Sequence, residues 1–439
     1  MSYRRREICP ECNQKYEGEW CKPCNSKHFQ NNFNNWTSGN DKIDKFIQNA
    51  QLNSDSSHRV IEWIPYDRFK DVKQIGRGGF GTIHYARWID GIIEEWDIEN
   101  QQWKRYCIGG EEEQEVALKT FDDLNLNDVL NEMEIHAKMY KKNVSIDFYG
   151  ITQDPKTHKY MMALFYAKDG NLREYLKINF NNIKWERKLF CLLALSRSLK
   201  DIHSLDIVHQ DFHPGNIVSY NFETTVLITD FGLSKLIEEN PNSPEKKIIG
   251  VLPYIAPEVL CGKKYTKAAD VYSFGIIAYE IVTGFPPYPD IPHDLDLAIK
   301  ICNGLRPKIP FHIPKIITRM IMKCWDARVE HRPTFEELHD ESWHNYKFRN
   351  LKDLEIGFQI KKAEEFSAIQ ESNNTTTTKT TTPLNYQTHP QAFYTSRLLN
   401  YSNLPQPKNE ENFGRELEEL TKSMFDSSTE DSGIVDLDF

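Results

Sequence analysis

Two kinds of hydrophobic pattern follow one another in the central part of the chain, between residues 69 and 346. Short runs of β-branched and aromatic residues come first, as at Val72 and Ile83, and they indicate β-strands. Further along, apolar residues recur at every third or fourth position, as at Leu130 and Met133, which is typical of amphipathic helices. We therefore interpret residues 69–346 as the globular part of the chain, with strands followed by helices.

The regions on either side of this part have a different composition. Residues 1–28 contain a cluster of cysteines, and residues 29–68 read as a polar, asparagine-rich linker with one short helical pattern around Ile43. Residues 347–439 include a threonine tract and several prolines, so we expect a mostly disordered C-terminal tail. A helical repeat at residues 410–424 predicts either a helix that binds a partner or a transient helix in this tail.

The composition narrows the class of protein. The 439 residues include 24 Phe, 20 Tyr and 9 Trp, which is enough for a sizeable core. Lys and Arg total 54 against 64 Asp and Glu, and the net charge of −10 argues against a nucleic-acid-binding protein, since a phosphate backbone requires a basic surface. No apolar run is long enough to span a bilayer, and no apolar signal region follows the first residues. Five of the 9 cysteines are scattered singly, as in reduced intracellular proteins, so we expect a cytoplasmic or nuclear location.

The other four cysteines form two pairs with metal-ligand spacing. Two residues separate Cys9 from Cys12 and also Cys21 from Cys24, and eight residues lie between the pairs. Such pairs can supply the four thiolates of a tetrahedral zinc site, and so short a segment has too little core to fold without a staple of this kind. We predict a structural Zn²⁺, with unligated thiols as the alternative. His28 could replace one ligand, but we expect it at the surface.

Glycines at positions 76, 78 and 81 indicate a phosphate-binding loop. The run Gly76-Arg-Gly-Gly-Phe-Gly81 lets backbone amides approach phosphates without a Cβ in the way. The same spacing marks dinucleotide-binding folds, but there a helix begins at the third glycine. Here residues 82–88 are β-branched and aromatic, which favours a β-hairpin that covers a nucleotide.

A lysine and a glutamate further along could hold the phosphates of that nucleotide. Lys119 ends the strand-like run Val116-Ala-Leu-Lys119, and Glu132 lies beside the buried stripe of a helical segment at residues 129–139. A buried lysine directed at phosphates needs a carboxylate that holds its position and charge. Glu132 is the better candidate for this carboxylate, because Glu134 faces elsewhere on the helix.

Three side chains that could serve phosphoryl transfer come later in the chain. Asp211 and Asn216 lie between two apolar stretches, and Asp230 ends a short strand-like run before Phe231 and Gly232. Carboxylate and amide oxygens are ligands that Mg²⁺ accepts. Phosphoryl transfer requires a metal on the phosphates, a carboxylate near the attacking hydroxyl and a cation on the donor. The ordered set from the glycine loop to Asp230 therefore predicts this chemistry.

Residues 69–346 resemble a eukaryotic protein kinase catalytic domain from end to end. The motifs that extend the resemblance are Ala256-Pro-Glu258, at the end of the activation segment, Asp270-Val-Tyr-Ser-Phe-Gly275, in the central helix of the large lobe, and Cys324-Trp325 with His331-Arg332-Pro, in the closing helices. The closing motifs are similar to the tyrosine-kinase-like and tyrosine-kinase groups, and the tryptophan-rich region is similar to expanded kinase families of fungi. The resemblance implies an α+β, two-lobed kinase fold, with a small β-rich lobe and a large helical lobe.

The resemblance also implies roles for the candidate residues. Asp211 would orient the substrate hydroxyl, and Lys119, paired with Glu132, would hold the α- and β-phosphates of ATP. Asn216 and Asp230 would bind Mg²⁺. The implied cofactors are therefore ATP and Mg²⁺.

Further roles concern the nucleotide pocket and the large lobe. Leu164 would be the gatekeeper, Ala167 would meet adenine through its backbone, and Glu258 would pair with Arg332 as a structural brace. The nucleotide pocket implied by the resemblance consists of Ile75, Gly76, Arg77, Gly78, Gly79, Phe80, Gly81, Thr82, Ile83, Ala117, Lys119, Leu164 and Ala167.

Three features depart from the common kinase pattern. Residues 88–115 form a long insertion with three tryptophans, which could be a docking surface or an elongated hairpin without a partner. Gln210 stands where most members have an arginine before the catalytic aspartate, and His213 stands where a lysine or arginine is usual. Val251 replaces the threonine typical of serine/threonine kinases, so the choice between Ser/Thr and Tyr specificity stays open.

The sequence therefore predicts an ATP-dependent protein kinase that phosphorylates serine or threonine, or else tyrosine, hydroxyls of protein substrates in intracellular signalling. The rival interpretations are a nucleotide-binding pseudokinase scaffold and an adaptor in which the zinc module and the tail carry the function. Partner proteins would dock through residues 88–115, the zinc module or the tail, and we expect no nucleic acid and no membrane span. Because Gln210 is uncharged, we expect activity without phosphorylation of the activation segment.

Overall fold

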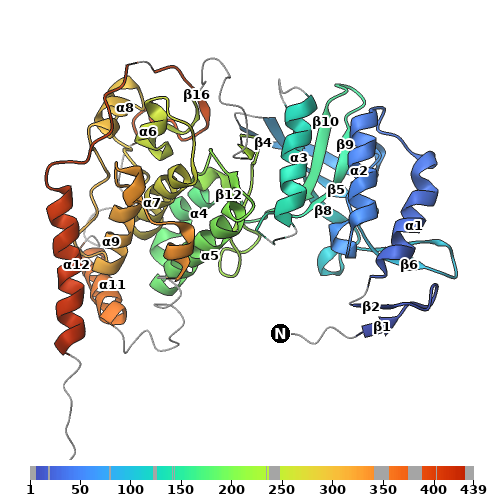
Figure 1. The fold of residues 1–439 in the computed structure, drawn as a ribbon, viewed down its shortest axis with the longest axis horizontal. Coiled ribbons are helices and arrows are strands. Elements are labelled where there is room, and N and C mark those ends of the chain that lie inside the picture. The colour runs from blue at the N-terminus through green and yellow to red at the C-terminus, as the bar shows by residue number, and fades with distance from the viewer. Residues whose placement is uncertain are drawn as a thin grey trace, which may run out of the picture. The chain divides into compact units, whose positions relative to one another are not determined.

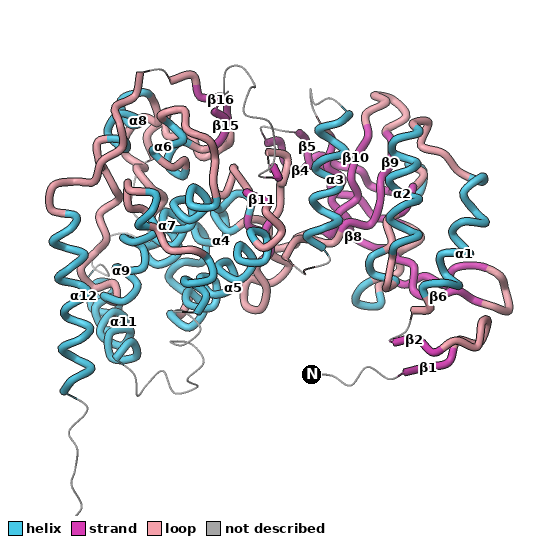
Figure 2. The backbone as a smooth tube through the Cα atoms, in the orientation of Figure 1, coloured by secondary structure: helices cyan, strands magenta, loops and turns pink. Residues whose placement is uncertain are grey.

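β-Strands are concentrated in the first part of the chain and helices in the second, and the computed structural model divides accordingly into two units, Met1–Lys168 and Asp169–Phe439 (Figure 1). Figure 2 shows the same contrast by secondary structure, which confirms the predicted α+β class with a β-rich and a helical lobe. The structure describes residues 6–17, 20–78, 81–121, 126–140, 142, 144–233, 235–236, 248–340, 355–373, 388–401 and 403–430.

The first unit is built on a 6-stranded sheet with the strand order β3-β9-β10-β8-β5-β4. Its strands are β3 (Glu62–Trp63), β4 (Phe69–Gly78), β5 (Gly81–Trp88), β8 (Gln114–Thr120), β9 (Phe148–Gln153) and β10 (Tyr160–Phe165). Neighbouring strands are antiparallel, except that β3 runs parallel to β9. Val116 and Leu118 lie two residues apart, so both point to the face that buries Trp88. Helix α3 (Leu126–Tyr140) contacts β9.

Residues 29–68, predicted to be a linker, carry packed secondary structure. Helix α2 (Asp41–Asn53) fills part of this stretch and contacts β3, which is itself a strand of the sheet. Ile43 and Ile47 of α2 are fully buried, because a spacing of four residues places both on one face of a helix. The predicted helical pattern is therefore present, and the stretch belongs to the first unit.

The insertion at residues 88–115 forms a hairpin that packs on the N-terminal helix. The elements concerned are β6 (Ile92–Asp97), β7 (Gln102–Tyr106) and α1 (Lys22–Asn32). Trp103 stacks on Phe29 with 4.5 Å between ring centroids, and Trp96 stacks on His28 at 4.0 Å. The insertion therefore packs on helix α1 of its own chain.

The second unit consists mainly of helices, and none of the described helices in the chain is both long and apolar enough to cross a membrane. Those of the second unit are α4 (Leu172–Asn179), α5 (Trp185–His203), α6 (Pro257–Leu260), α7 (Lys267–Thr283), α8 (Leu295–Cys302), α9 (Lys315–Cys324), α11 (Glu355–Asn373) and α12 (Phe413–Glu430), and residues 335–340 are also helical. Helix α7 is buried along nearly its whole length. Gly275 permits its close contact with α9, since a Cβ there would lie 2.7 Å from the Cβ of Cys324.

Short antiparallel strand pairs shape the loops of this unit. They are β11 (Ile207–Val208) with β14 (Lys235–Leu236), β12 (Ile217–Val218) with β13 (Leu227–Ile228), and β15 (Ile248–Gly250) with β16 (Arg397–Leu399). The last pair joins two segments that lie far apart in the sequence.

The C-terminal region 347–439, predicted to be mostly disordered, contains α11, β16 and α12. Within this region, β16 pairs with β15 and α12 contacts α9 of the second unit. The threonine tract at residues 375–382 lies outside the described residues.

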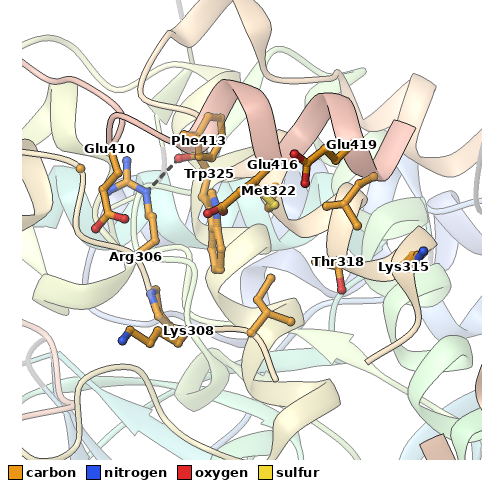
Figure 3. A pocket seen from close by; sticks show the side chains of 14 residues that line it. Arg306, Lys308, Lys315, Thr318, Met322, Trp325, Glu410, Phe413, Glu416 and Glu419 are labelled. Carbon is orange, nitrogen blue, oxygen red and sulfur yellow. Dashed lines mark hydrogen bonds between the residues drawn. The ribbon is translucent and has the colours of Figure 1, made fainter. Parts of the chain in front are cut away.

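Helix α12 contains the repeat predicted at residues 410–424, and it contacts α9 of the same unit (Figure 1). A pocket of about 600 Å³ opens between the two helices, with Phe413 and Leu420 from α12 and Met322 from α9 in its lining. Figure 3 shows the acidic side chains Glu416 and Glu419 at its α12 side. None of the predicted phosphate or metal ligands lines this pocket. The partner of the predicted helix is therefore the chain's own second unit.

Candidate active site

The predicted phosphate-binding lysine forms a buried ion pair. Lys119 lies on β8 and Glu132 on α3, and Lys119 Nζ donates a hydrogen bond to Glu132 Oε1 at 2.5 Å. The two side chains are 6% and 1% exposed, so little water screens their attraction. Glu134 is exposed, as its place on the helix predicts. The pair fixes the lysine in one position, which is what a phosphate-binding cation needs.

The described glycines of the loop lie at the end of β4 and the start of β5, which pair antiparallel, and the strand expected after the third glycine begins at Gly81. No side chain fits on Gly81, because a Cβ there would lie 1.9 Å from the carbonyl oxygen of Thr120. The Thr82 N–H donates to Thr120 Oγ1 at 3.2 Å, and the Thr120 hydroxyl donates to the Thr82 carbonyl at 2.9 Å. These bonds hold the end of the loop next to the strand that carries Lys119. Gly79 and Phe80 lie outside the described residues.

The remaining residues of the predicted nucleotide pocket lie on neighbouring strands of the same sheet. Ala117 of β8 pairs with Leu164 of β10, and Leu164 is buried. Ala167 follows β10 and is half-buried. Ile75 and the first two glycines lie on β4, and Thr82 with Ile83 on β5. The strand order β10-β8-β5-β4 therefore gathers the described members of this set in the first unit.

Asp211 lies in a buried loop of the second unit whose backbone is held by Asp270 of α7. Asp270 Oδ2 accepts a hydrogen bond from the His209 N–H at 2.9 Å, and Oδ1 accepts one from the Gln210 N–H at 3.2 Å. Gln210 has a φ of 68°, a conformation that costs about 1–2 kcal/mol for a residue with a side chain. The two bonds to Asp270 offset that cost and fix the loop. His203 Nε2 lies 2.9 Å from Asp270 Oδ2 and adds a third contact.

The β12–β13 pair brings the two predicted metal ligands together. Asn216 directly precedes β12, Asp230 lies two residues after β13, and the Thr229 N–H donates to the Asn216 carbonyl at 2.9 Å. Asn216 Nδ2 donates to the Asp211 carbonyl at 2.9 Å, so the amide oxygen of Asn216 is the atom left for a cation. An amide oxygen beside a carboxylate is a donor set that suits Mg²⁺. Burial lowers the pKa of the neighbouring His209, which keeps that ring neutral.

His213 lies against the carboxylate of Asp211. Its Nε2 is 3.6 Å from Asp211 Oδ2, and its Nδ1 accepts a hydrogen bond from the Gly215 N–H at 3.0 Å. Because Nδ1 accepts, the proton of the neutral ring resides on Nε2, the nitrogen that faces Asp211. The position at which a lysine or arginine was expected therefore still provides an N–H donor. The sequence identified His213 as the replacement. It did not predict the contact of His213 with Asp211, or the hydrogen bonds that Asp270 accepts from the loop backbone.

The four N-terminal cysteines meet at the pair of strands β1 (Arg6–Ile8) and β2 (Lys15–Glu17) and the start of α1. Their sulfur atoms all lie within 4.8 Å of one another. The Sγ atoms of Cys9 and Cys24 are 3.7 Å apart, and those of Cys12 and Cys21 are 3.8 Å apart. Tetrahedral zinc with Zn–S bonds of about 2.3 Å places its sulfur ligands about 3.8 Å apart. The four thiols therefore fit Zn²⁺ as predicted.

His28 is not part of this cluster. Its Nε2 lies 2.9 Å from Glu11 Oε1, and its ring stacks on Trp96. Burial raises the pKa of the Cys24 thiol, and the nearby thiols of Cys12 and Cys9 raise it further. A bound cation would reverse this effect, because zinc ligands are thiolates.

A match to a known family covers the part of the chain that carries these sites. Residues 69–341 match the family described as protein tyrosine and serine/threonine kinase. The chain belongs to the protein kinase family. The match begins with β4 and ends directly after the helical residues 335–340, so the kinase domain includes both the Lys119 and the Asp211 sites.

Related kinases of more than one specificity are similar to this domain. The chain is 30% identical over 307 residues to the serine/threonine-protein kinase/receptor R831 of Acanthamoeba polyphaga mimivirus, covering 68% of this chain and 16% of the relative. It is 29% identical over 291 residues to tyrosine-protein kinase SPK-1 of Girardia tigrina, covering 63% and 53%. It is also 29% identical over 240 residues to stress-activated protein kinase alpha of Dictyostelium discoideum, covering 51% and 37%. The chain thus spans only part of these relatives.

The kinase domain contains the brace implied between Glu258 and Arg332. Both terminal guanidinium nitrogens of Arg332 donate to the Glu258 carboxylate at 2.7 Å, and the side chains of Arg332 and Glu258 are 0% and 3% exposed. Removing one partner leaves a buried charge without compensation. We expect Glu258→Ala to lower the free energy of unfolding by about 3–5 kcal/mol, measured by urea denaturation.

The matched control for the brace is Glu174→Ala. Glu174 pairs with Lys177 at 3.9 Å on the surface of the same unit, where the side chains are 56% and 63% exposed. Its loss should cost less than about 1 kcal/mol. Equal losses in the two variants would contradict a bracing role for Glu258.

Proposed function

We propose that this kinase domain is catalytically active and transfers the γ-phosphoryl group of ATP to serine or threonine hydroxyls of proteins. The observation that carries the proposal is the buried Lys119–Glu132 ion pair, since kinases require this pair to be in place for phosphoryl transfer. The intact Asp211, Asn216 and Asp230 support the same conclusion.

In the proposed mechanism each candidate group has one task. Lys119, positioned by Glu132, holds the α- and β-phosphates of ATP, and the amides of the glycine loop cover them. Asn216 and Asp230 hold Mg²⁺, which supplies positive charge on the phosphates. Asp211 accepts a hydrogen bond from the acceptor hydroxyl and aligns it for attack on the γ-phosphorus.

Several finer assignments belong to this proposal. The closing motif around Trp325 and Arg332 supports membership of the tyrosine-kinase-like group, and the tryptophans of the insertion support a likeness to expanded fungal kinases. Gln210 supports a kinase of the class that lacks arginine before the catalytic aspartate. The cysteines are thiols and do not form disulfides, which supports an intracellular, cytoplasmic setting.

The experiment that tests the proposal measures two properties of the purified full chain. Label from γ-radiolabelled ATP should appear, in the presence of Mg²⁺, on serine or threonine of protein substrates, as phosphoamino-acid analysis would show. Nucleotide binding is measured in parallel as a shift in melting temperature. Binding without any label on protein would favour the rival, a pseudokinase scaffold, and would refute the proposal.

A separate prediction concerns control by the activation segment. Gln210 is uncharged, so a phosphate on that segment would lack the cation that usually binds it at this position. We expect the double variant Ser234→Ala, Ser243→Ala to keep its turnover within tenfold of the wild type; both serines lie outside the described residues. A fall of tenfold or more, about 1.4 kcal/mol in the barrier, would show that another cation replaces the missing arginine.

A further inference from the structure

A strand from the C-terminal tail pairs with the activation segment. β16 pairs antiparallel with β15, with Gly250 opposite Arg397 and Ile248 opposite Leu399. Figure 2 shows the two strands side by side, although the segments are far apart in the sequence. Addition of an extended segment to a free strand edge is a common way to bind a peptide, because the backbone supplies the affinity and the side chains supply the register.

This register places a serine hydroxyl on the proposed catalytic carboxylate. Ser396 lies one residue before β16, and its hydroxyl donates a hydrogen bond to Asp211 Oδ2 at 2.6 Å. His213 Nε2 lies 3.1 Å from Ser396 Oγ. Since Nε2 of His213 carries the proton, it donates to Ser396 Oγ while the hydroxyl proton points to Asp211. An acceptor hydroxyl needs this arrangement, with its proton directed to the base and its oxygen held in place.

Side chains before the serine anchor the tail in the second unit. The Tyr394 hydroxyl donates to the Pro287 carbonyl at 2.9 Å, and the guanidinium of Arg173 lies 4.5 Å above the Tyr394 ring. The His293 N–H donates to the Gln391 carbonyl at 2.9 Å. These contacts fix the tail two to five residues before Ser396.

Side chains after the serine anchor it as well. The Arg397 guanidinium donates to the His293 carbonyl, and its charge lies 4.7 Å from the Phe393 ring centroid. Leu399 is buried, with 4% exposed, whereas its neighbour Leu398 is 46% exposed. The segment is thus held on both sides of the hydroxyl, as a bound peptide substrate would be.

We propose that residues 388–401 are an internal substrate, that Ser396 is phosphorylated by its own kinase domain, and that the segment excludes other acceptors until this happens. The proposal rests on the proposed kinase activity and deepens it by naming an acceptor. It also favours serine over tyrosine, because a hydroxyl on the short serine side chain reaches Asp211 from a strand paired with β15.

The reaction balances without any further reactant. Ser396 Oγ attacks the γ-phosphorus of ATP, the new O–P bond forms, and the bond from the γ-phosphorus to the bridging oxygen breaks with its electrons on ADP. The hydroxyl proton passes to Asp211 Oδ2 and then to water. The product carries a phosphate of charge −1.5 to −2 beside the buried Asp211 carboxylate. Repulsion between these charges would expel the strand and open the site to other substrates.

The test compares variants of the full chain after incubation with ATP and Mg²⁺. Intact mass and peptide mapping should find about one phosphate per chain on Ser396 in the wild type and none in Asp211→Asn or Ser396→Ala. The rate per molecule should not change on a hundredfold dilution, because the reaction is intramolecular. Thr395→Ala is the matched control: Thr395 is exposed, and its loss should leave the modification in place.

Exclusion of other substrates is tested with a synthetic peptide of residues 388–401. Leu399→Asp removes a buried anchor, so it should abolish phosphorylation of Ser396 and raise the initial rate on the peptide at least fivefold. Leu398→Asp, on the exposed face of the same strand, should behave as the wild type.

Three results would overturn the internal-substrate proposal. The first is phosphorylation of the peptide while Ser396 of the wild type stays unmodified, and the second is phosphate on Thr395 in its place. The third is a rate per molecule that rises with protein concentration, which would assign the tail to a second copy. Failure of the kinase proposal differs from all three, because neither the peptide nor any chain would then be labelled, even with Leu399→Asp.

Discussion

Lys119→Met is expected to lower the rate of phosphoryl transfer about 10³-fold, equivalent to ~4 kcal/mol in the barrier. Most of the catalysis of this reaction is positioning and charge stabilisation, and methionine supplies neither a charge for the phosphates nor a partner for Glu132. The substitution also removes the cation that Glu132 contacts at 2.5 Å. Because Glu132 is fully buried, its carboxylate would then lie away from water without that cation. The rate is measured as label transferred from γ-radiolabelled ATP to the peptide of residues 388–401. Every protein compared also carries Leu399→Asp, so that the tail does not block the site.

The control for this variant is Lys104→Met. Lys104 lies on β7 of the same unit and pairs with Glu95 at 2.7 Å, but its side chain is 49% exposed. Its replacement should leave the rate unchanged. Melting temperatures are compared first, because loss of one buried partner can also destabilise the domain. A folded Lys119→Met protein with more than a tenth of the control's rate would contradict the role of the Lys119–Glu132 pair.

Zinc removal is expected to unfold the N-terminal cysteine segment while the kinase domain stays folded. We expect one Zn²⁺ per chain, bound by Cys9, Cys12, Cys21 and Cys24, because their sulfur atoms already lie at the spacing of a tetrahedral site. Structural zinc contributes about 10–16 kcal/mol in isolated zinc-binding segments, so a strong chelator should abolish the local fold. Elemental analysis gives the stoichiometry, and hydrogen exchange at residues 6–17 and 20–32 follows the local unfolding.

Cys107→Ser is the control for the zinc prediction, because Cys107 lies in the same unit but outside the four-cysteine cluster. It should retain one equivalent of zinc, whereas Cys9→Ser should lose it. The stacking of Trp103 on Phe29 should report the change as altered tryptophan fluorescence. Less than about a tenth of an equivalent in protein purified without chelator would refute the zinc site.

Sequence patterns were most informative where the chemistry depends on residues close together or in a fixed order. Lys119 and Glu132 lie 13 positions apart, and strand and helix periods orient their side chains toward each other. The cysteine spacing likewise contains nearly all the information that a tetrahedral site needs. Such local patterns predicted strands followed by helices and the pairing of Lys119 with Glu132.

Contacts between distant segments could not be predicted in this way. Ser396 and Asp211 are 185 residues apart, and Ser396 follows a threonine- and proline-rich stretch whose composition indicates disorder. The apolar face of Ile43 and Ile47 was visible, but not the sheet that it covers. The tryptophans of the insertion indicated a docking surface, but nothing in their spacing identified α1 as the partner.

The most direct test of the central claim compares wild-type protein with Asp211→Asn. Asparagine keeps the size of the side chain but removes the carboxylate that receives the hydroxyl proton, so nucleotide binding and melting temperature should be retained. The measurement is the rate at which label from γ-radiolabelled ATP appears on protein hydroxyls at saturating Mg²⁺. If the domain is an active kinase, the wild type should transfer label steadily, and Asp211→Asn should transfer it about 10³-fold more slowly. Equal rates for the two folded proteins, or no transfer by the wild type, would contradict it.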